Sequence, residues 1–192
     1  MPAILLVPPA SEPLSLAEVK NFLRVEHDDD DALIGSLIAS ARGQVEAATR
    51  RVLITQEWRI ALDRWPKPEC NKSARVVSPV NPLRALIEAR VLAADGGATV
   101  LDPDAFTLDT VSTPGMIAFE RANVTEPGRA LAGIELDVSA GYGESAASVP
   151  EPLRQAIRLL LARAYEHRDR VEGDVLPADV ARLIAPYRIL SL

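Results

Sequence analysis

The side chains that could carry acid–base or nucleophilic chemistry are few in this sequence of 192 residues. It contains two histidines, His27 and His167, and a single cysteine, Cys70. A serine or cysteine hydrolase needs a histidine beside its nucleophile, yet no serine lies in the strand–turn–helix motif that presents one. Cys70 lies in a proline-flanked loop, and His167 is expected near the end of a helix, where a cation is favourable. We therefore predict no catalytic residue.

Metal and phosphate sites are no better supported by the sequence. Four consecutive aspartates, residues 28–31, could attract a metal ion, but a long amphipathic stretch begins directly after them. Aspartate is favoured there because it accepts hydrogen bonds from the free amides of a first helical turn. Gly96-Gly97 and Gly141-Tyr142-Gly143 lack the lysine and the strand-to-helix context of a phosphate-binding loop, and we interpret both as turns. No metal and no cofactor are predicted.

Charge and cysteine usage narrow the class of protein. Lysine and arginine total 21 against 27 aspartates and glutamates, a net charge of −6. Gripping nucleic acid requires clustered basic side chains that face phosphates, so this balance disfavours it, but it permits a protein that surrounds DNA without holding it. A single cysteine excludes an internal disulfide and fits a reducing compartment. The apolar run Ala3–Val7 is far too short for a signal peptide or a membrane span.

The first third of the chain is expected to be helical after a short arm. Prolines at positions 2, 8, 9 and 13 forbid a helix and predict an extended arm over residues 1–14. Ser15 and Glu18 have the spacing of a capping box, which predicts a helix start. The second helix follows the aspartates and ends at Arg50-Arg51, so residues 15–51 are predicted to form a helical hairpin.

One pair on the second helix has the spacing of an ion pair. Arg42 and Glu46 stand four residues apart. Side chains at this spacing are neighbours on a helix surface, so we expect an ion pair on the solvent side.

A period of two replaces the helical spacing after residue 52. Residues 54–62 alternate as a half-buried strand, and residues 66–75 are expected to be an exposed loop. Ile87, Ala89 and Val91 alternate with charged residues, and Asp95-Gly96-Gly97 is typical of a hairpin turn. Residues 76–140 hold four basic and nine acidic side chains, so this antiparallel segment is acidic. We predict a β insertion over residues 52–143.

A second helical region is predicted to begin at Pro150, because proline is favourable in a first helical turn. Its helices are expected over residues 150–186, with apolar residues on one face of the longer helix and arginines on the others. The fold class is therefore α+β: the N- and C-terminal helices form one bundle with an antiparallel β insertion, in a single domain over residues 15–192. The arginines of the longer helix are Arg154, Arg158, Arg163 and Arg168.

The terminal segment, residues 187–192, is unusually apolar. A free, solvated end is normally more polar. Two interpretations stay open: Ile189 and Leu190 fold back on their own domain, or the segment docks on a partner, for example by adding a strand to a sheet. The segment consists of Tyr187, Arg188, Ile189, Leu190, Ser191 and Leu192.

Motifs in this order resemble the head–tail connector proteins of long-tailed phages and gene transfer agents, also called adaptor or head-completion proteins. The longest is residues 14–66, LSLAEVKNFLRVEHDDDDALIGSLIASARGQVEAATRRVLITQEWRIALDRWP. The others are Asp95-Gly96, Ala140-Gly141-Tyr142-Gly143, Val149-Pro150-x-x-Leu153, Ala164-Tyr165-Glu166-His167-Arg168 and Ala185-Pro186-Tyr187-Arg188. Each motif is weak alone, but the ordered set spans nearly the whole chain.

The resemblance implies a structural, non-enzymatic virion component without a cofactor. Its subunits would form a ring, expected to be dodecameric, between the portal and the stopper or tail-completion protein in the neck of a phage-like particle, assembled in the bacterial cytoplasm. Double-stranded DNA would pass through without sequence recognition, and no membrane partner is expected. Residues 187–192 would bind the portal. The arginines at 154, 158, 163 and 168 would meet an acidic neighbouring face in the ring, because a cyclic ring joins two different surfaces.

Other functions remain as alternatives. A stopper or tail-completion ring would differ from an adaptor in which component touches the portal. A small hydrolase or transferase would need a pocket that gathers His27 or His167 with carboxylates. A host regulatory interaction domain is the remaining class.

Overall fold

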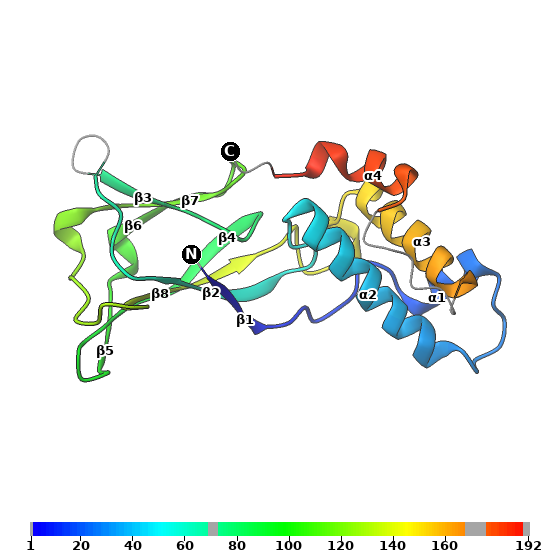
Figure 1. Ribbon diagram of the computed structural model, residues 1–192, viewed down its shortest axis with the longest axis horizontal. Helices are drawn as coiled ribbons and strands as arrows, with labels where there is room; N and C mark the ends of the chain where they lie inside the picture. The colour runs from blue at the N-terminus through cyan, green and yellow to red at the C-terminus, as the bar shows by residue number, and fades with distance from the viewer. Residues whose placement is uncertain (1, 69–72, 168–175, 190–192) are drawn as a thin grey trace. The chain divides into compact units, whose positions relative to one another are not determined.

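The computed structural model describes residues 2–68, 73–167 and 176–189 (Figure 1). It has the α+β composition predicted from the sequence, with four α-helices and two antiparallel sheets in the described residues. The chain divides into two compact units. The sheet unit consists of residues 1–8 and 55–141, and the helical unit of residues 9–54 and 142–192. That residues 15–192 act as a single domain stays a prediction.

The helical unit contains α1 (Leu16–Leu23), α2 (Asp31–Thr49), α3 (Glu151–Glu166) and α4 (Ala178–Ile184). The predicted capping box starts α1. The Ser15 hydroxyl accepts from the amide of Glu18 at 3.2 Å, and the Glu18 carboxylate accepts from the amide of Ser15 at 2.9 Å. This reciprocal pair satisfies two amides that the helix itself leaves free. Short 3-10 turns lie at Ala146–Ser148 and Ala185–Tyr187.

The aspartates before α2 form contacts other than the predicted capping hydrogen bonds. Asp30 is the N-cap residue, but its side chain makes no capping hydrogen bond. Instead the ammonium of Lys20 contacts Asp28 at 2.5 Å and Asp31 at 2.7 Å, and the hydroxyl of Tyr165 donates to Asp30 at 2.5 Å. The acidic run therefore ties the loop between α1 and α2 to α1 and α3. The predicted helix start is confirmed, whereas capping by the Asp30 side chain is wrong.

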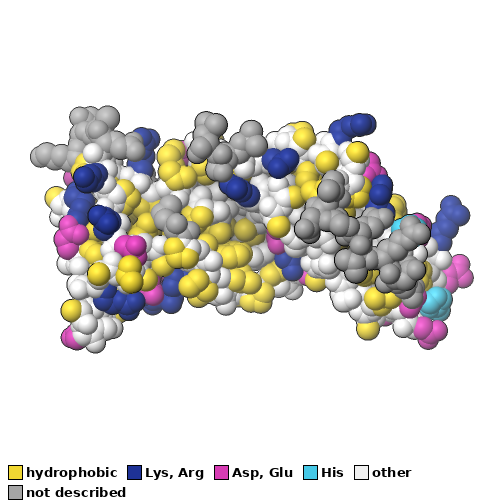
Figure 2. Space-filling view, viewed as in Figure 1, with side chains coloured by type: hydrophobic (Ala, Val, Ile, Leu, Met, Phe, Trp, Pro, Cys, Tyr) yellow, Lys and Arg dark blue, Asp and Glu magenta, His cyan; other side chains and the backbone are white. Residues whose placement is uncertain are grey.

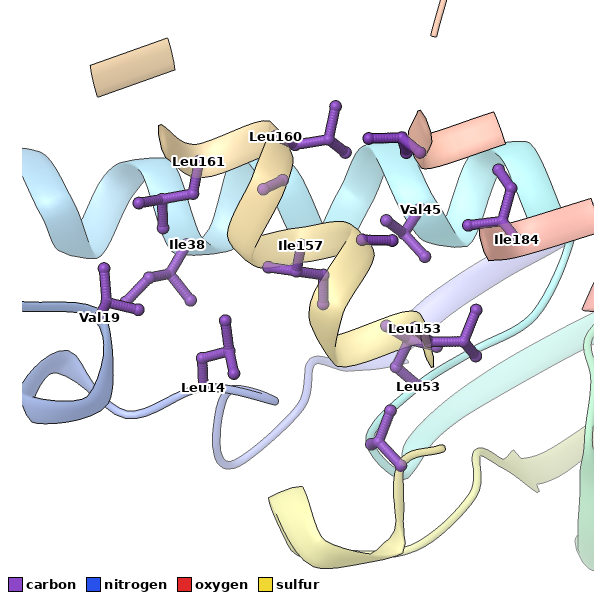
Figure 3. Close-up of a cluster of buried hydrophobic side chains, with 14 of the residues drawn as sticks. Leu14, Val19, Ile38, Val45, Leu53, Leu153, Ile157, Leu160, Leu161 and Ile184 are labelled. Carbon is purple, nitrogen blue, oxygen red and sulfur yellow. The ribbon is translucent and has the colours of Figure 1, made fainter. Parts of the chain in front are cut away.

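The apolar stripes of all four helices meet in one core, as predicted for the N- and C-terminal segments (Figure 3). Ile34 and Val45 of α2 and Leu153, Ile157 and Leu161 of α3 are completely buried. Burying an aliphatic side chain of this size stabilises a fold by about 1.5–3 kcal/mol. The helical unit thus obtains its stability from residues on both sides of the insertion. The core also includes Leu14, Val19, Ile38, Leu53, Leu160, Val180 and Ile184.

Arg42 and Glu46 form the predicted ion pair at 2.8 Å, but not on the solvent side. Their side chains are only 16% and 17% exposed. Arg42 also contacts Glu12 at 2.8 Å, and Glu46 accepts from the amide of Leu53 at 2.9 Å. Burial raises the pKa of Glu46 despite the neighbouring guanidinium. The pair joins α2 to the segment that precedes α1 and to the segment that follows α2.

The sheet unit contains two antiparallel sheets. The larger has the order β1 (Ala3–Val7), β2 (Gln56–Leu62), β8 (Ile134–Ala140), β4 (Leu83–Leu92) and β5 (Ala98–Val100). The smaller has the order β3 (Ser73–Val77), β7 (Met116–Glu120) and β6 (Phe106–Asp109). The predicted loop 66–75 is wrong for residues 73–75, because they pair with β7. Within the predicted arm, residues 3–7 are a strand paired with β2, whereas the chain bends at residues 10–11 and 13–14.

The five-stranded sheet has one buried and one partly exposed face. On the buried face, Ile134, Leu136, Val138 and Ala140 of β8 have no exposed surface. Leu86 and Glu88 are paired with consecutive residues of β8, so Ile87 between them lies in a β-bulge. The predicted alternation fails at Ile87, whose side chain is 47% exposed, because a bulge adds one residue to the strand.

Candidate assembly surfaces

The side chains considered for catalysis do not form a site among the described residues. No group of three histidine, cysteine, aspartate or glutamate side chains there could hold a metal ion. His27 is exposed, with Nδ1 3.9 Å from Asp29 Oδ2, and His167 follows the end of α3. Cys70 lies outside the described residues. In the same part of the chain, every helix is too short or too polar to cross a bilayer.

The arginines of α3 are held within the helical unit. The guanidinium of Arg154 contacts Glu18 at 2.6 Å and Glu151 at 2.9 Å, and it donates to the carbonyl of Pro13 at 3.1 Å. Arg158 contacts Glu151 at 2.5 Å. These contacts join α1 to α3. The hydrogen bond from Arg158 lowers the pKa of Glu151, and the Ser15 amide, followed by both arginines, lowers that of Glu18.

Arg163 pairs with Asp179 of α4 at 3.1 Å, and both side chains are largely exposed. Arg168 lies outside the described residues. Each of the three described arginines predicted at a ring interface therefore has a partner in its own chain. Their role in a ring stays a prediction.

The beginning of the terminal segment lies against the end of α2. Arg51 Nε donates to the carbonyl of Tyr187 at 2.6 Å, and the amide of Ile189 donates to the carbonyl of Thr49 at 3.1 Å. Arg188 is exposed between these two contacts. Leu190, Ser191 and Leu192 lie outside the described residues. Portal binding by this segment stays a prediction.

A network of charged side chains covers the centre of the exposed face of the five-stranded sheet. Asp137 accepts two hydrogen bonds from Arg59, at 2.7 and 2.8 Å, and one from Arg90 at 3.1 Å. Arg90 also contacts Glu135 at 2.6 Å and Glu88 at 2.8 Å. The charged positions alternate in the sequence, but only the pairing of β2, β8 and β4 shows that they meet. Sequence reasoning missed this network for that reason.

Both edges of the same sheet carry exposed apolar side chains. The first edge is β1, where Ile4, Leu5, Leu6 and Val7 are 38–55% exposed. The opposite edge is β5, where Val100 is 60% exposed. Figure 2 shows hydrophobic side chains gathered over the sheet unit. An edge strand has one row of free amides and carbonyls, and natural proteins usually protect it with charges. Neither strand contains a charged residue.

Comparison with known proteins gives a family match over part of the chain and the fold of the whole chain. Residues 13–81 match the model of a family described as phage gp6-like head-tail connector proteins. No curated protein matches the chain. The description of that family agrees with the head–tail connector resemblance predicted from the sequence.

Three solved structures share the fold over all of this chain and 97% of theirs. A chain in the neck of an empty gene transfer agent (GTA) particle, computed with C6 symmetry, has 24% identity and a TM-score of 0.81. One in the virion of a native GTA particle has 23% identity and a TM-score of 0.78. One in the neck of a native GTA particle, computed with C12 symmetry, has 25% identity and a TM-score of 0.77. The resemblance to head–tail connector proteins is therefore confirmed by the family model over residues 13–81, and the whole chain has the fold of chains in GTA particles.

Proposed function

We propose that this protein is an adaptor subunit in the neck of a phage-like particle, where copies of it form a ring between the portal and the stopper or tail. Two observations support the proposal. The whole chain has the fold of subunits in GTA necks, and residues 13–81 independently match a head–tail connector family. The ring would extend the channel through which DNA passes. Its net charge of −6 suits a wall that DNA crosses without adhering.

The two edges of the five-stranded sheet are the surfaces that best suit ring closure. A cyclic ring joins one surface of a subunit to a different surface of the next. Strands β1 and β5 are opposite edges of one sheet, and both are apolar and exposed. Joining them would continue the sheet from subunit to subunit and would pair the free backbone groups. The arginines of α3 are the second choice, because a contact there must compete with Glu18, Glu151 and Asp179.

The terminal segment, residues 187–192, is the proposed contact with the portal. The backbone of its first three residues is held at the end of α2 by hydrogen bonds at positions 187 and 189, and Arg188 between them is exposed. An apolar extended segment can bind by adding a strand to a partner's sheet.

A pull-down with assembled portal tests this contact. We expect the complete chain to bind and a chain truncated after Ile189 to be lost from the portal fraction. Equal capture of both chains contradicts the docking role. Cryo-electron microscopy of the intact neck then tests the position. Density for this chain directly beneath the portal supports an adaptor, and density only below another ring contradicts it.

A further inference from the structure

Three segments that are far apart in the sequence meet at the C-terminal end of α2. The helix ends at Thr49, and Arg50 adopts a left-handed conformation with φ 56° that turns the chain. The amide of Tyr142 donates to the carbonyl of Leu53 at 3.1 Å, which brings in the segment that follows β8. The amide of Ile189 donates to the carbonyl of Thr49, which places the terminal segment at the same helix end. All these residues belong to the helical unit.

Arg51 lies at the centre of this junction. Its Nε donates to the Tyr187 carbonyl at 2.6 Å, and its guanidinium carbon lies 6.0 Å from the centre of the Tyr142 ring. A guanidinium is planar and permanently charged, so it can stack on an aromatic ring while it donates a charge-assisted hydrogen bond. A lysine at the same position has no flat face and could not make both contacts in this geometry.

The second contact of the terminal segment gives a hydrogen-bond donor to a carbonyl at the end of α2. The last carbonyls of an α-helix have no partner within the helix. The amide of Ile189 donates to one of them, that of Thr49, at 3.1 Å. Thr49 itself is fully buried, and its hydroxyl donates to the carbonyl of Val45 at 2.7 Å. The terminal segment is therefore bonded at two backbone positions, residues 187 and 189, to a rigid part of the core.

We propose that Arg51 is a positioning residue for portal docking: it fixes the place and direction in which the chain continues beyond Ile189. The inference rests on the proposed function, since it assumes that residues 187–192 bind the portal. A segment held in its binding direction loses less conformational freedom when it binds. Arg51 does not itself contact the portal; it acts through the carbonyl of Tyr187.

The test uses the full-length chain and four variants. Arg51→Ala removes both contacts, and Arg51→Lys keeps the charge without the planar group. Arg182→Ala is the matched control, because it removes the same charge from an exposed position on α4. Truncation after Ile189 removes the proposed docking residues. Two quantities are measured: the hydrogen-exchange rate of the Ile189 amide in the free protein and the affinity for assembled portal.

We expect Arg51→Ala to speed exchange at Ile189 and to weaken portal binding about tenfold, the effect of losing one charge-assisted hydrogen bond. Arg51→Lys should fall between Arg51→Ala and the unsubstituted chain, which keeps the test informative if Arg51→Ala folds poorly. Arg182→Ala should change neither quantity.

The outcomes separate the inference from the proposed function. If truncation abolishes binding while both Arg51 variants bind the portal normally, the positioning role is wrong and the docking segment stands. If the truncated chain binds as well as the complete chain, the docking role itself fails and the inference fails with it. Unchanged exchange at Ile189 in Arg51→Ala also overturns the inference, because the segment would then be held without Arg51.

Discussion

At the scale of single residues, Asp137 is the acceptor that Arg59 and Arg90 share on the five-stranded sheet. The residue is 9% exposed, and its carboxylate accepts from both Arg59 and Arg90. A charge taken out of water is tolerated only when it is paired and hydrogen-bonded. Removing the shared carboxylate therefore takes from Arg59 the acceptor of both its hydrogen bonds and from Arg90 one of its three carboxylate partners.

We expect Asp137→Ala to lower the free energy of unfolding by about 1–3 kcal/mol, the cost of leaving such groups unpaired. Urea denaturation followed by tryptophan fluorescence measures it. Glu88→Gln is the matched control at the edge of the same network. Its side chain is more exposed, so we expect a loss of less than about 1 kcal/mol. Equal losses in the two variants would show that the network does not depend on Asp137.

The stability of the helical unit depends on pH through the carboxyl group of Glu18. The amide of Ser15, followed by Arg154 and Arg158, lowers the pKa of its carboxyl below the ordinary value of 4.5. The folded state thus binds the proton less tightly than the unfolded state does. This contribution to stability is complete above pH 4.5 and is lost as the pH falls through the lowered pKa.

We therefore expect Glu18→Gln to be less stable than the unsubstituted chain at pH 7, with a difference that shrinks as the pH falls below 4.5. Urea denaturation followed by circular dichroism at several pH values measures this. Glu26→Gln, at an exposed position after α1, is the control and should show no such convergence. A constant difference between Glu18→Gln and the unsubstituted chain at every pH would contradict the assignment.

At the scale of elements, strand β1 combines apolar side chains with a free edge. We expect Ile4→Lys to prevent association between subunits and to change the free energy of unfolding by less than about 0.5 kcal/mol, because the position is exposed. Sedimentation in the presence of portal measures ring formation. Val111→Lys is the control, since Val111 is 93% exposed in the same unit but lies outside the strands. Rings that form equally well with lysine at position 4 exclude this edge from the interface.

Elements defined by neighbouring residues could be predicted from the sequence. The capping box at Ser15 needs only a spacing of three residues, and the hairpin at Gly96, with φ 90°, needs only a turn composition. Elements that depend on residues far away in the sequence could not be predicted in this way. Residues 73–75 become a strand because β7 lies beside them, and Ile87 is exposed because β4 pairs with β8 through a bulge. The charged network and the contact of Arg51 with Tyr187 depend on such distant pairing as well.

At the scale of the whole molecule, the two units contain different spectroscopic reporters. Both tryptophans, Trp58 and Trp65, belong to the sheet unit, whereas the four α-helices belong to the helical unit. The order of helices, strands and helices predicted the α+β class, because a long apolar helical stripe must be buried against another element.

We expect Ile157→Ala to destabilise the helical unit by about 2–5 kcal/mol, because it leaves a cavity in a completely buried core position. Circular dichroism at a helix wavelength should then show unfolding at lower urea concentration, while tryptophan fluorescence shows the transition of the unsubstituted chain. Leu159→Ala is the control at a partly buried position of the same helix and should have a smaller effect. Coincident shifts in both probes would mean that the units unfold as one.

The bond from Ile189 to Thr49 also has a consequence for synthesis on the ribosome. The helix that ends at Thr49 leaves the ribosome early, but its last partner and the α3 half of its core are made only after the whole insertion. The core of the helical unit cannot be complete until α3 and α4 have emerged, and the bond from Ile189 to Thr49 forms after them. A chain that stops within the insertion therefore leaves the apolar face of α2 without the α3 residues that cover it.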